Sequence, residues 1–326
     1  MRAAQIVGYG EPPHLVDVAP PARPAGHCVI ATRAVPITPL DVLCATGQSY
    51  FGAPALPYVP GVQGVGVVVD SDSLDPGTRV WFPTSAGMAP GDGSLAERAA
   101  AVEADVIPLP AGVPDELVAA LGLSAVAAWM SVAVRGALQA GEVVLVLGAG
   151  GVVGQVALQV ARLLGAGRVV AAARSGDSCE LARQYGADAV VPLRGDEDAA
   201  GLAARLERAC EAPVDLVVDP LCGVPASAAI RVLGHGGRLV NLGGSAGPTA
   251  EFDSATLRSR SAAILGYTNN SLTSAARRDA LTRVLDHAVR DGLTVSHEVV
   301  DWASGPAAWA RQAEGDARRR IVVTVA

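Results

Sequence analysis

The chain has 326 residues, half of them hydrophobic and 17% charged, so a wholly disordered chain is excluded and about two domains are expected. The net charge of −7 argues against nucleic acid or an anionic membrane as the main partner. All 25 basic residues are Arg, which excludes every mechanism that depends on a lysine, such as a Schiff base or a P-loop.

The cysteines are scattered along the chain, and none of them form a C-x-x-C pair. They are Cys28, Cys44, Cys179, Cys210 and Cys222. This spacing fits neither a zinc ribbon nor a small disulfide framework, and it suits a reducing compartment. The N-terminus does not resemble a signal peptide, so we expect a cytoplasmic protein. The apolar stretch from Leu117 to Val134 predicts a buried helix rather than a membrane span, because Gly122, Ser124 and Ser131 interrupt it.

Residues 1–115 are predicted to form short strands separated by turns. The expected strands are Val29–Ala34, Val65–Val69, Arg79–Phe82 and Leu95–Val102. Turn signals such as Pro12-Pro13 and Asp75–Gly77 punctuate this part of the chain. Many short strands with such turns indicate a barrel-like β domain.

From about residue 115 the pattern changes to strands that alternate with helices. The expected strands are Val143–Leu147, Arg168–Ala173, Ala189–Val191, Leu216–Asp219, Arg238–Leu242 and Ala262–Gly266. The expected helices are 152–164, 179–185, 198–210 and 225–233. This β-α-β spacing predicts an α/β fold with a parallel, doubly wound sheet. The last helix, 274–290, and the strands 295–300 and 321–325 are expected to complete the first domain.

The strongest local signal is the glycine turn, defined as Gly148–Gly154, which follows a buried strand and enters a helix. Glycines let the backbone approach a pyrophosphate, and the helix N-terminus offers free N–H groups. The spacing fits G-x-x-G-x-x-G, because Val153 stands where the last glycine of G-x-G-x-x-G belongs. We expect a dinucleotide site here, with a glycine turn that binds nothing as the alternative. The expected contacts are Gly148, Gly150, Gly151, Val152 and Val153.

Arg174 and Ser175 follow the second strand of this pattern, where an NAD enzyme usually places Asp or Glu against the ribose hydroxyls. Here the acid is missing and a cation stands in its place, as the 2′-phosphate of NADPH requires. The sequence therefore predicts NADPH, with a merely exposed Arg after a strand as the alternative.

The segment Gly243–Gly247 matches the G-x-S-x-G nucleophile elbow of hydrolases. An elbow requires a helix directly after Ser245, whereas the following residues predict a loop. A hydrolase stays open as an alternative, because acids and histidines follow in the right chain order. They are Asp286 or Asp301 with His287 or His297. We prefer the interpretation that this segment is a glycine-rich loop at the carboxyl edge of the sheet, where Leu242 and Gly243 would contact the cofactor.

Together these motifs resemble the medium-chain dehydrogenase/reductase superfamily, in its zinc-independent quinone oxidoreductase and enone reductase branch. The landmarks span nearly the whole chain. They are Thr38–Asp41, Gly47–Tyr50, Pro57–Gly66, Gly93–Glu97, Leu121–Ala125, the glycine turn, Gly236–Val240 and Gly266–Asn270. The resemblance implies a GroES-like catalytic domain in residues 1–115 and 269–326, and a Rossmann cofactor-binding domain in residues 116–268. It also implies an active site between the two and a homodimer through the Rossmann domain.

The zinc alcohol dehydrogenases of the superfamily carry Cys where this chain has Thr38, and His-Glu where it has Val62-Gln63. A catalytic zinc needs three protein ligands and an open position. The resemblance therefore implies no metal. The branch itself usually has Asn in place of Thr38 and an acid in place of Gln63, which makes a specialised enone a further candidate substrate.

Without a metal, the resemblance implies hydride transfer from NADPH to an activated C=C bond of an enone, quinone or enoyl substrate. Tyr50 would donate to the substrate oxygen, Asp41 would orient the neighbouring loop, and Thr38 would lie beside them. The alternative for Tyr50 is a packed core tyrosine.

The resemblance also implies contacts with the nicotinamide end of the cofactor. Ser124 would bond the ribose, and Asn269 and Asn270 would line the pocket. Helix capping for Ser124 and turn chemistry for the two Asn residues are the alternatives. Two rival functions stay open for the whole chain: reduction of a C=N or C=O bond in secondary metabolism, and a non-catalytic NADPH-binding sensor.

Overall fold

The computed structural model describes residues 1–325 and divides the chain into two compact units. Unit 1 contains residues 1–123 and the chain from Thr273 onward, and unit 2 contains Ser124–Leu272. The first boundary falls inside helix α2 (Asp115–Trp129), a few residues later than the sequence pattern predicts, because the first turns of this helix belong to unit 1.

Unit 1 is built on a seven-stranded sheet in the order β14-β15-β3-β4-β5-β7, with β6 paired to β3. The strands are β3 (His27–Ile37), β4 (Gln63–Asp70), β5 (Arg79–Pro83), β6 (Arg98–Val102), β7 (Ile107–Pro108), β14 (His297–Val300) and β15 (Arg320–Thr324). Strand β15 pairs antiparallel with β3, so that Ile321 lies opposite Ile37. The C-terminal strands therefore extend the sheet that the N-terminal strands begin.

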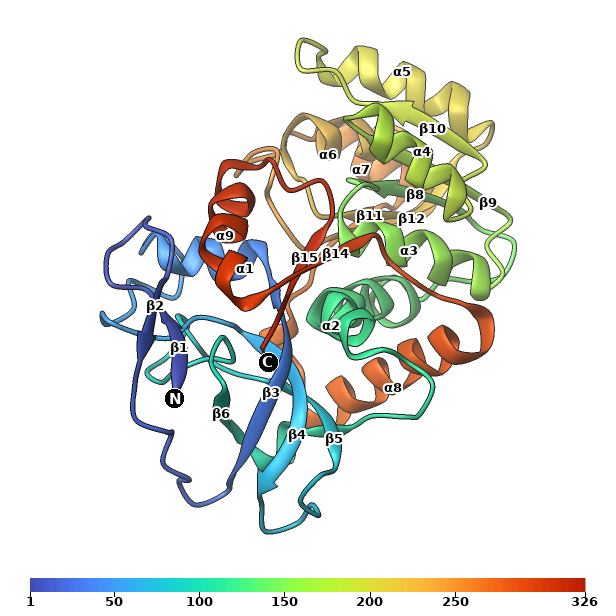
Figure 1. Ribbon diagram of the computed structural model, residues 1–326. Coiled ribbons are helices and arrows are strands. Elements are labelled where there is room, and N and C mark those ends of the chain that lie inside the picture. The colour runs from blue at the N-terminus through green and yellow to red at the C-terminus, as the bar shows by residue number, and fades with distance from the viewer. Residues whose placement is uncertain (326) are drawn as a thin grey trace. The chain divides into compact units, whose positions relative to one another are not determined.

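Smaller elements surround this sheet. They are the antiparallel pair β1 (Arg2–Gln5) and β2 (His14–Asp17), and the helices α1 (Pro39–Ala45), α8 (Ser274–Asp291) and α9 (Gly305–Glu314). Figure 1 shows α1 and α9 side by side, and the two helices are in contact. In β5, Val80, Trp81 and Phe82 are all fully buried. Successive side chains of a strand point to opposite faces, so both faces of β5 are covered.

Unit 2 contains a six-stranded parallel sheet in the order β10-β9-β8-β11-β12-β13. The strands are β8 (Val143–Leu147), β9 (Arg168–Ala173), β10 (Ala189–Pro192), β11 (Val214–Asp219), β12 (Leu233–Asn241) and β13 (Ala263–Gly266). Counted along the chain, this is the order 3-2-1-4-5-6 of the Rossmann fold. The predicted doubly wound sheet is confirmed.

The helices of unit 2 cover this sheet. They are α3 (Val152–Leu163), α4 (Gly176–Gln184), α5 (Ala199–Cys210), α6 (Gly223–Ile230) and α7 (Ser254–Arg260). Helix α3 packs beside α4, and α5 packs beside α6. Right-handed crossovers put these two pairs on opposite faces. This explains why β8 is apolar throughout: a parallel strand covered on both faces has no polar side. The sequence pattern missed α7, which has no buried residue and hence no apolar periodicity.

The predicted buried helix around Leu117–Val134 is confirmed. Within residues 1–325, Asp115–Arg135 is the one helix long and apolar enough to span a membrane, but 67% of its most apolar window is buried inside the protein. The helix is kinked at Gly122 and ends in a π-helical stretch, Met130–Arg135.

Candidate functional site

The glycine turn joins β8 to α3 and leaves no room for side chains at two positions. Gly148 has φ +63°, a left-handed conformation that glycine adopts without strain. A Cβ at Gly154 would lie 2.5 Å from the carbonyl oxygen of Gly148, and a Cβ at Gly150 would overlap the Ser178 hydroxyl. At Gly151, by contrast, a Cβ would meet nothing nearer than 3.6 Å. The turn is therefore closely packed at Gly150 and Gly154 and open at Gly151.

The N-terminus of α3 carries backbone donors without acceptors in the helix. The first N–H with such an acceptor is that of Gln155, which donates to the Gly151 carbonyl at 2.9 Å. The N–H groups of Val152, Val153 and Gly154 precede it and have no intrahelical acceptor. The N-cap, Gly151, has no side chain that could satisfy them. Free N–H groups at the positive end of a helix fit the oxygens of a pyrophosphate, so the residues present suit a dinucleotide.

Arg174 and Ser175 follow β9 at the same carboxyl edge of the sheet. Ser175 is the N-cap of α4, and its hydroxyl accepts the N–H of Ser178 at 3.1 Å. Arg174 is exposed and forms no ion pair with any residue that the structure describes. A guanidinium is thus available beside a turn suited to a dinucleotide.

The loop after β11 lies against the glycine turn. A Cβ at Gly148 would come within 2.9 Å of the Leu221 side chain. Asp219 shapes this loop: its buried carboxylate accepts the N–H groups of Leu221 at 3.0 Å and Cys222 at 2.8 Å, and the Asn241 amide at 2.8 Å. Burial raises the pKa of Asp219, and these hydrogen bonds oppose the shift. Sequence reasoning missed the role of Asp219, although an acid as the last residue of a buried strand was a visible signal.

Leu242 and Gly243 lie next to the same loop. The N–H of Leu242 donates to the Asp219 carbonyl at 2.9 Å, and a Cβ at Gly243 would lie 2.6 Å from the Pro220 carbonyl oxygen. The structure therefore brings Leu242 and Gly243 to the carboxyl edge that also carries the glycine turn.

The hydrolase alternative is wrong. The hydroxyl of Ser245 donates to the Pro220 carbonyl at 3.3 Å, and the next helix starts only at Ser254. His287 is bonded to Asp291, at 2.6 Å. The segment is a glycine-rich loop and lacks the helix of a nucleophile elbow.

The predicted nicotinamide contacts lie near the first and the last residue of unit 2 in the sequence. Ser124 is half-buried, two residues beyond the kink of α2. Asn269 accepts the Tyr267 hydroxyl at 2.6 Å, and the N–H of Asn270 donates to the Thr268 hydroxyl at 3.3 Å. Turn hydrogen bonds thus engage both Asn residues, and their contact with the nicotinamide stays a prediction.

In unit 1, Thr38 and Asp41 form a capping box at the start of α1. One carboxylate oxygen of Asp41 accepts the N–H and the hydroxyl of Thr38, at 2.9 and 2.6 Å. The other accepts the N–H groups of Gly61 at 3.1 Å and Val62 at 2.8 Å. These bonds tie α1 to the loop before β4, which favours the predicted loop-orienting role for Asp41 over a role in proton transfer.

A buried arginine faces this carboxylate. Arg320, the first residue of β15, donates to the carbonyl of Ile37 at 2.7 Å, directly before Thr38. Burial raises the pKa of Asp41, opposed by the Thr38 and Val62 hydrogen bonds and by the charge of Arg320. Burial also lowers the pKa of Arg320 to about 10, opposed by Asp41. Sequence reasoning missed Arg320, because only the pairing of β15 with β3 brings it to this place.

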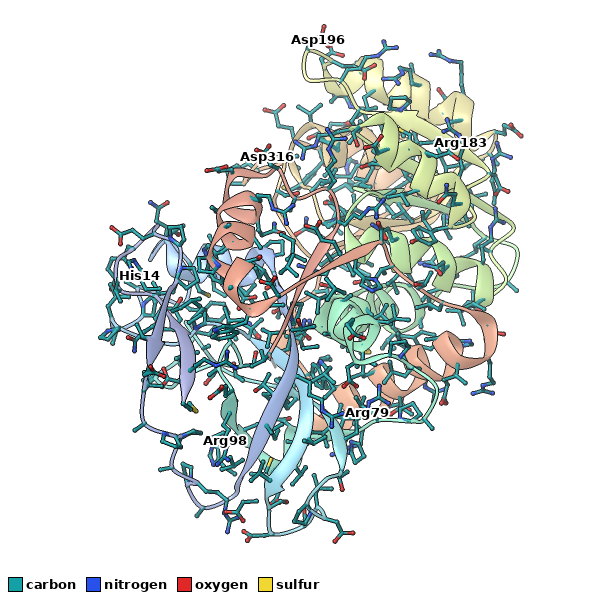
Figure 2. All side chains as sticks on the ribbon, viewed as in Figure 1. His14, Arg79, Arg98, Arg183, Asp196 and Asp316 are labelled. Carbon is teal, nitrogen blue, oxygen red and sulfur yellow. The ribbon has the colours of Figure 1, made fainter. Side chains whose placement is uncertain are left out.

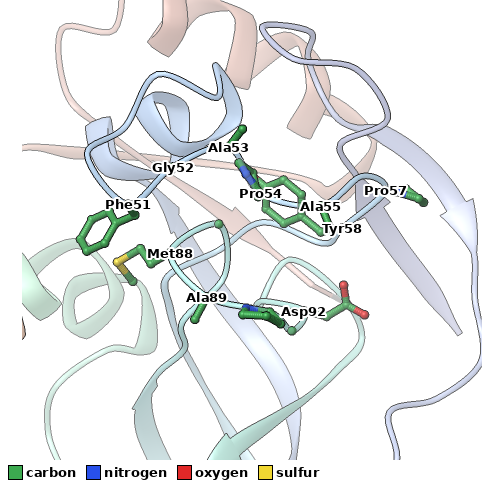
Figure 3. Close-up of a pocket in the computed structure, with 13 residues that line it drawn as sticks. Phe51, Gly52, Ala53, Pro54, Ala55, Pro57, Tyr58, Met88, Ala89 and Asp92 are labelled. Carbon is green, nitrogen blue, oxygen red and sulfur yellow. The ribbon is translucent and has the colours of Figure 1, made fainter.

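Tyr50 is 78% exposed and lies against Phe51, with ring centroids 4.1 Å apart. The alternative of a packed core tyrosine is therefore wrong. A hollow of about 320 Å³ lies next to this pair, between the loops 51–58 and 87–92 (Figure 3). Its lining is largely apolar, with Phe51 and Met88 at one end and Asp92 at the other.

The donor set of unit 1 does not fit a catalytic zinc. The Thr38 hydroxyl is engaged with Asp41, and Val62 has no donor atom in its side chain. The side-chain oxygen of Gln63 accepts the indole N–H of Trp81 at 3.1 Å. Zinc is held in proteins by thiolate, imidazole and carboxylate ligands. Within residues 1–325 no group of three or more His, Cys, Asp and Glu side chains is placed to hold a metal ion.

Comparison with known families gives two matches. Residues 24–111 match the alcohol dehydrogenase GroES-like domain, and residues 152–287 match the family described as zinc-binding dehydrogenase. The first match covers the strands β3 to β7 of unit 1, and the second runs from helix α3 of unit 2 into helix α8 of unit 1.

Individual relatives extend this similarity over most of the chain. The quinone oxidoreductase of Homo sapiens is 28% identical over 280 residues, which cover 84% of this chain and 82% of that protein. The quinone oxidoreductase from Thermus thermophilus, whose complex with NADPH has also been solved, is 29% identical, with a TM-score of 0.81 and full coverage of both chains. A probable oxidoreductase from Mycobacterium abscessus is 28% identical, with a TM-score of 0.85, and covers 100% of this chain and 99% of its own.

Proposed function

Since the chain belongs to the medium-chain dehydrogenase/reductase superfamily, in its quinone oxidoreductase branch, we propose that it is an NADPH-dependent, zinc-independent reductase of activated C=C bonds. Unit 1 is its GroES-like domain and unit 2 its Rossmann domain. The family makes it an oxidoreductase that acts on a small molecule with a nicotinamide cofactor. The proposal adds NADPH, the absence of zinc and the class of bond that is reduced.

The position and exposure of Arg174 support NADPH as the cofactor. It stands directly beyond β9 where an acid would favour NADH, and its guanidinium is exposed and forms no ion pair within the described chain. A charge-assisted bond to a 2′-phosphate contributes about 1.5–3 kcal/mol, or about ten- to a hundredfold in affinity. The NADPH complex of the Thermus thermophilus relative supports the same choice.

Replacement of Arg174 by Ala tests this choice. We expect Arg174→Ala to weaken NADPH binding by about ten- to a hundredfold and to leave NADH binding nearly unchanged. Arg183→Ala is the matched control, since Arg183 lies on the neighbouring helix α4 and is already paired with Glu180 (Figure 2). An equal loss for both cofactors in Arg174→Ala would contradict the choice of NADPH.

When bound at the glycine turn and Arg174, NADPH would supply hydride chemistry: the β carbon of an α,β-unsaturated carbonyl compound would gain the hydride, and the cofactor would leave as NADP+. The substrate oxygen would then carry negative charge until a proton from solvent reaches the α carbon and restores the carbonyl group. Tyr50 is the donor in unit 1 proposed to stabilise that charge, because its phenol is exposed rather than packed in the core. Asp41 keeps the loop before β4 in place through its bonds to Gly61 and Val62. The hollow beside Phe51 would hold the apolar part of the substrate.

The absence of zinc from the reaction is supported by the donor set of Thr38, Val62 and Gln63. Elemental analysis of protein purified without added zinc should find far less than one zinc atom per chain, and a chelator should leave turnover unchanged. One tightly bound zinc per chain would overturn this part of the proposal.

We further propose a homodimer through unit 2 in the cytoplasm. Strand β13 ends the sheet of unit 2 and leaves an edge, with Ile264 exposed, that a second copy could pair with. All five cysteines are free, which suits a reducing compartment. Sedimentation of the purified protein as a monomer at micromolar concentration would contradict the dimer.

A further inference from the structure

A second arginine lies at the edge of the sheet that carries Arg174. Strand β10 runs parallel to β9, with Pro192 opposite Ala173, and the N–H of Leu193 donates to the Ala173 carbonyl at 2.8 Å. Arg174 directly follows Ala173, and Arg194 directly follows Leu193. Neighbouring strands lie about 4.8 Å apart and rise about 3.3 Å per residue. The last paired residues, Ala173 and Pro192, therefore lie about 5 Å apart, and an arginine follows each strand end within two residues.

The charge of Arg194 is not neutralised by the acids on its own loop. Arg194 is exposed and forms no ion pair with any residue in the described range. Glu197, three residues further on, is bonded to Arg205 at 2.5 Å, and Arg205 also donates to the Pro192 carbonyl at 2.7 Å. Asp196 lies at the outer tip of the loop, exposed (Figure 2). Two arginines without an ion-pair partner among residues 1–325 thus follow neighbouring strands at the same edge of the sheet.

The same corner adds a helix N-terminus. Helix α4 begins at Gly176, directly after Arg174 and Ser175, and the positive end of its dipole faces the edge where both arginines emerge. The Ser175 hydroxyl accepts only the N–H of Ser178 among the first residues of α4. Two arginines and a helix N-terminus are therefore sources of positive potential at one edge of the sheet, with Asp177 as the acid in the first turn of α4. A group with two negative charges suits such a place.

We propose that Arg194 is a second binding residue for the 2′-phosphate of the cofactor and that it holds this phosphate together with Arg174. The proposal rests on NADPH being the cofactor in the function proposed above. A phosphate monoester carries close to two negative charges at neutral pH. One guanidinium neutralises half of that charge, and the second completes the site. Arg194 thereby becomes a determinant of the preference for NADPH over NADH.

The test uses the full chain and adenosine 2′,5′-bisphosphate as the probe, with 5′-AMP as the probe that lacks the 2′-phosphate. Calorimetric affinities are compared for wild type, Arg174→Ala, Arg194→Ala and the double variant. Arg208→Ala is the matched control, because Arg208 lies on α5 of the same unit, is exposed and forms no ion pair with the described residues. Thermal unfolding of each variant checks that the fold is retained.

We expect Arg194→Ala to bind the bisphosphate about tenfold more weakly, with 5′-AMP and the control unchanged, and the double variant to lose the preference for the bisphosphate. Wild-type affinity of Arg194→Ala, beside a loss in Arg174→Ala, would overturn this inference and leave the choice of NADPH intact. A wild-type chain that binds both probes equally would overturn the NADPH proposal itself.

Discussion

The side-chain oxygen of Gln63 accepts the backbone N–H of Leu123 at 2.7 Å, immediately after the kink in α2. At the kink Gly122 has φ +34° and ψ −133°, and a Cβ at this position would overlap the Gln63 side chain. The same oxygen of Gln63 accepts the indole N–H of Trp81 at 3.1 Å. The Gln63 side chain thus occupies the space that a side chain at position 122 would need, so that only glycine fits there. Gln63 stands where the zinc enzymes of the superfamily carry an acid.

This fit predicts that Gly122→Ala destabilises the protein by about 1–3 kcal/mol or more, because a strained backbone and a steric overlap act together. Urea unfolding followed by circular dichroism measures the change. Gly195→Ala is the control, since Gly195 has open space around it and no left-handed φ. If Gly122→Ala unfolds at the same urea concentration as Gly195→Ala, the close fit between Gln63 and Gly122 is not real.

Replacement of Asp41 by Asn tests the loop-orienting role. An amide cannot accept all four hydrogen bonds that the carboxylate accepts, and it removes the charge that faces Arg320. We expect a loss of about 1–3 kcal/mol in the free energy of unfolding at neutral pH. Asp17→Asn, on the exposed strand β2, should change it little. Equal stability of the two variants would contradict the role of Asp41.

The pH dependence of the same variant has a definite sign. Burial raises the pKa of Asp41 in the folded chain, so the folded state binds its proton more tightly than the unfolded state does. The contribution of this group to stability is therefore present at acid pH and is lost as the pH rises through the raised pKa. The stability advantage of wild type over Asp41→Asn should widen as the pH falls toward 3.8, the ordinary value. A constant difference would contradict the raised pKa.

Tyr50→Phe tests the proposed donor. We expect turnover with an enone to fall by about tenfold or more while NADPH affinity stays the same, since the proposed hydrogen bond is made to the substrate and not to the cofactor. Tyr185→Phe is the matched control and should keep the wild-type turnover, since Tyr185 lies at the C-terminal end of α4 in unit 2. A wild-type rate in Tyr50→Phe would make Tyr50 a wall of the substrate site rather than a donor.

Cys222 reports on cofactor binding without a turnover assay. It is half-buried beside Leu221, which lies against Gly148, whereas the other four cysteines are buried. Burial raises the pKa of Cys28 and Cys210 to about 11, so little thiolate forms there at neutral pH. We expect iodoacetamide to modify Cys222 first, and NADPH to slow that reaction. An unchanged rate at saturating NADPH, followed by mass spectrometry, would place the dinucleotide away from this loop.

The parts of the site that depend on local sequence could be predicted. The glycine turn and the helix after it follow from glycine spacing and apolar periodicity, and β8 and β9 have the predicted bounds. The capping box of α1 was also visible, as Thr38 followed three residues later by Asp41, although it was interpreted as a mark of the family.

Contacts between distant segments could not be predicted. Arg320 meets Asp41 only because β15 pairs with β3, and no pattern within either segment specifies that pairing. Arg194 lies beside Arg174 only because β10 follows β9 in the sheet. The exposure of Tyr50 is likewise a property of the folded loop, because the sequence around a tyrosine between glycines does not predict whether its side chain is buried or exposed.

Following the transferred hydride tests whether the protein reduces an activated C=C bond with NADPH. An α,β-unsaturated ketone is incubated with the protein and NADPH that carries deuterium at both C4 positions, and the product is analysed by NMR. We predict one deuterium per product molecule on the carbon β to the carbonyl group, with the carbonyl group retained. Deuterium on the carbonyl carbon, or no oxidation of NADPH with any enone of a panel, would contradict the account.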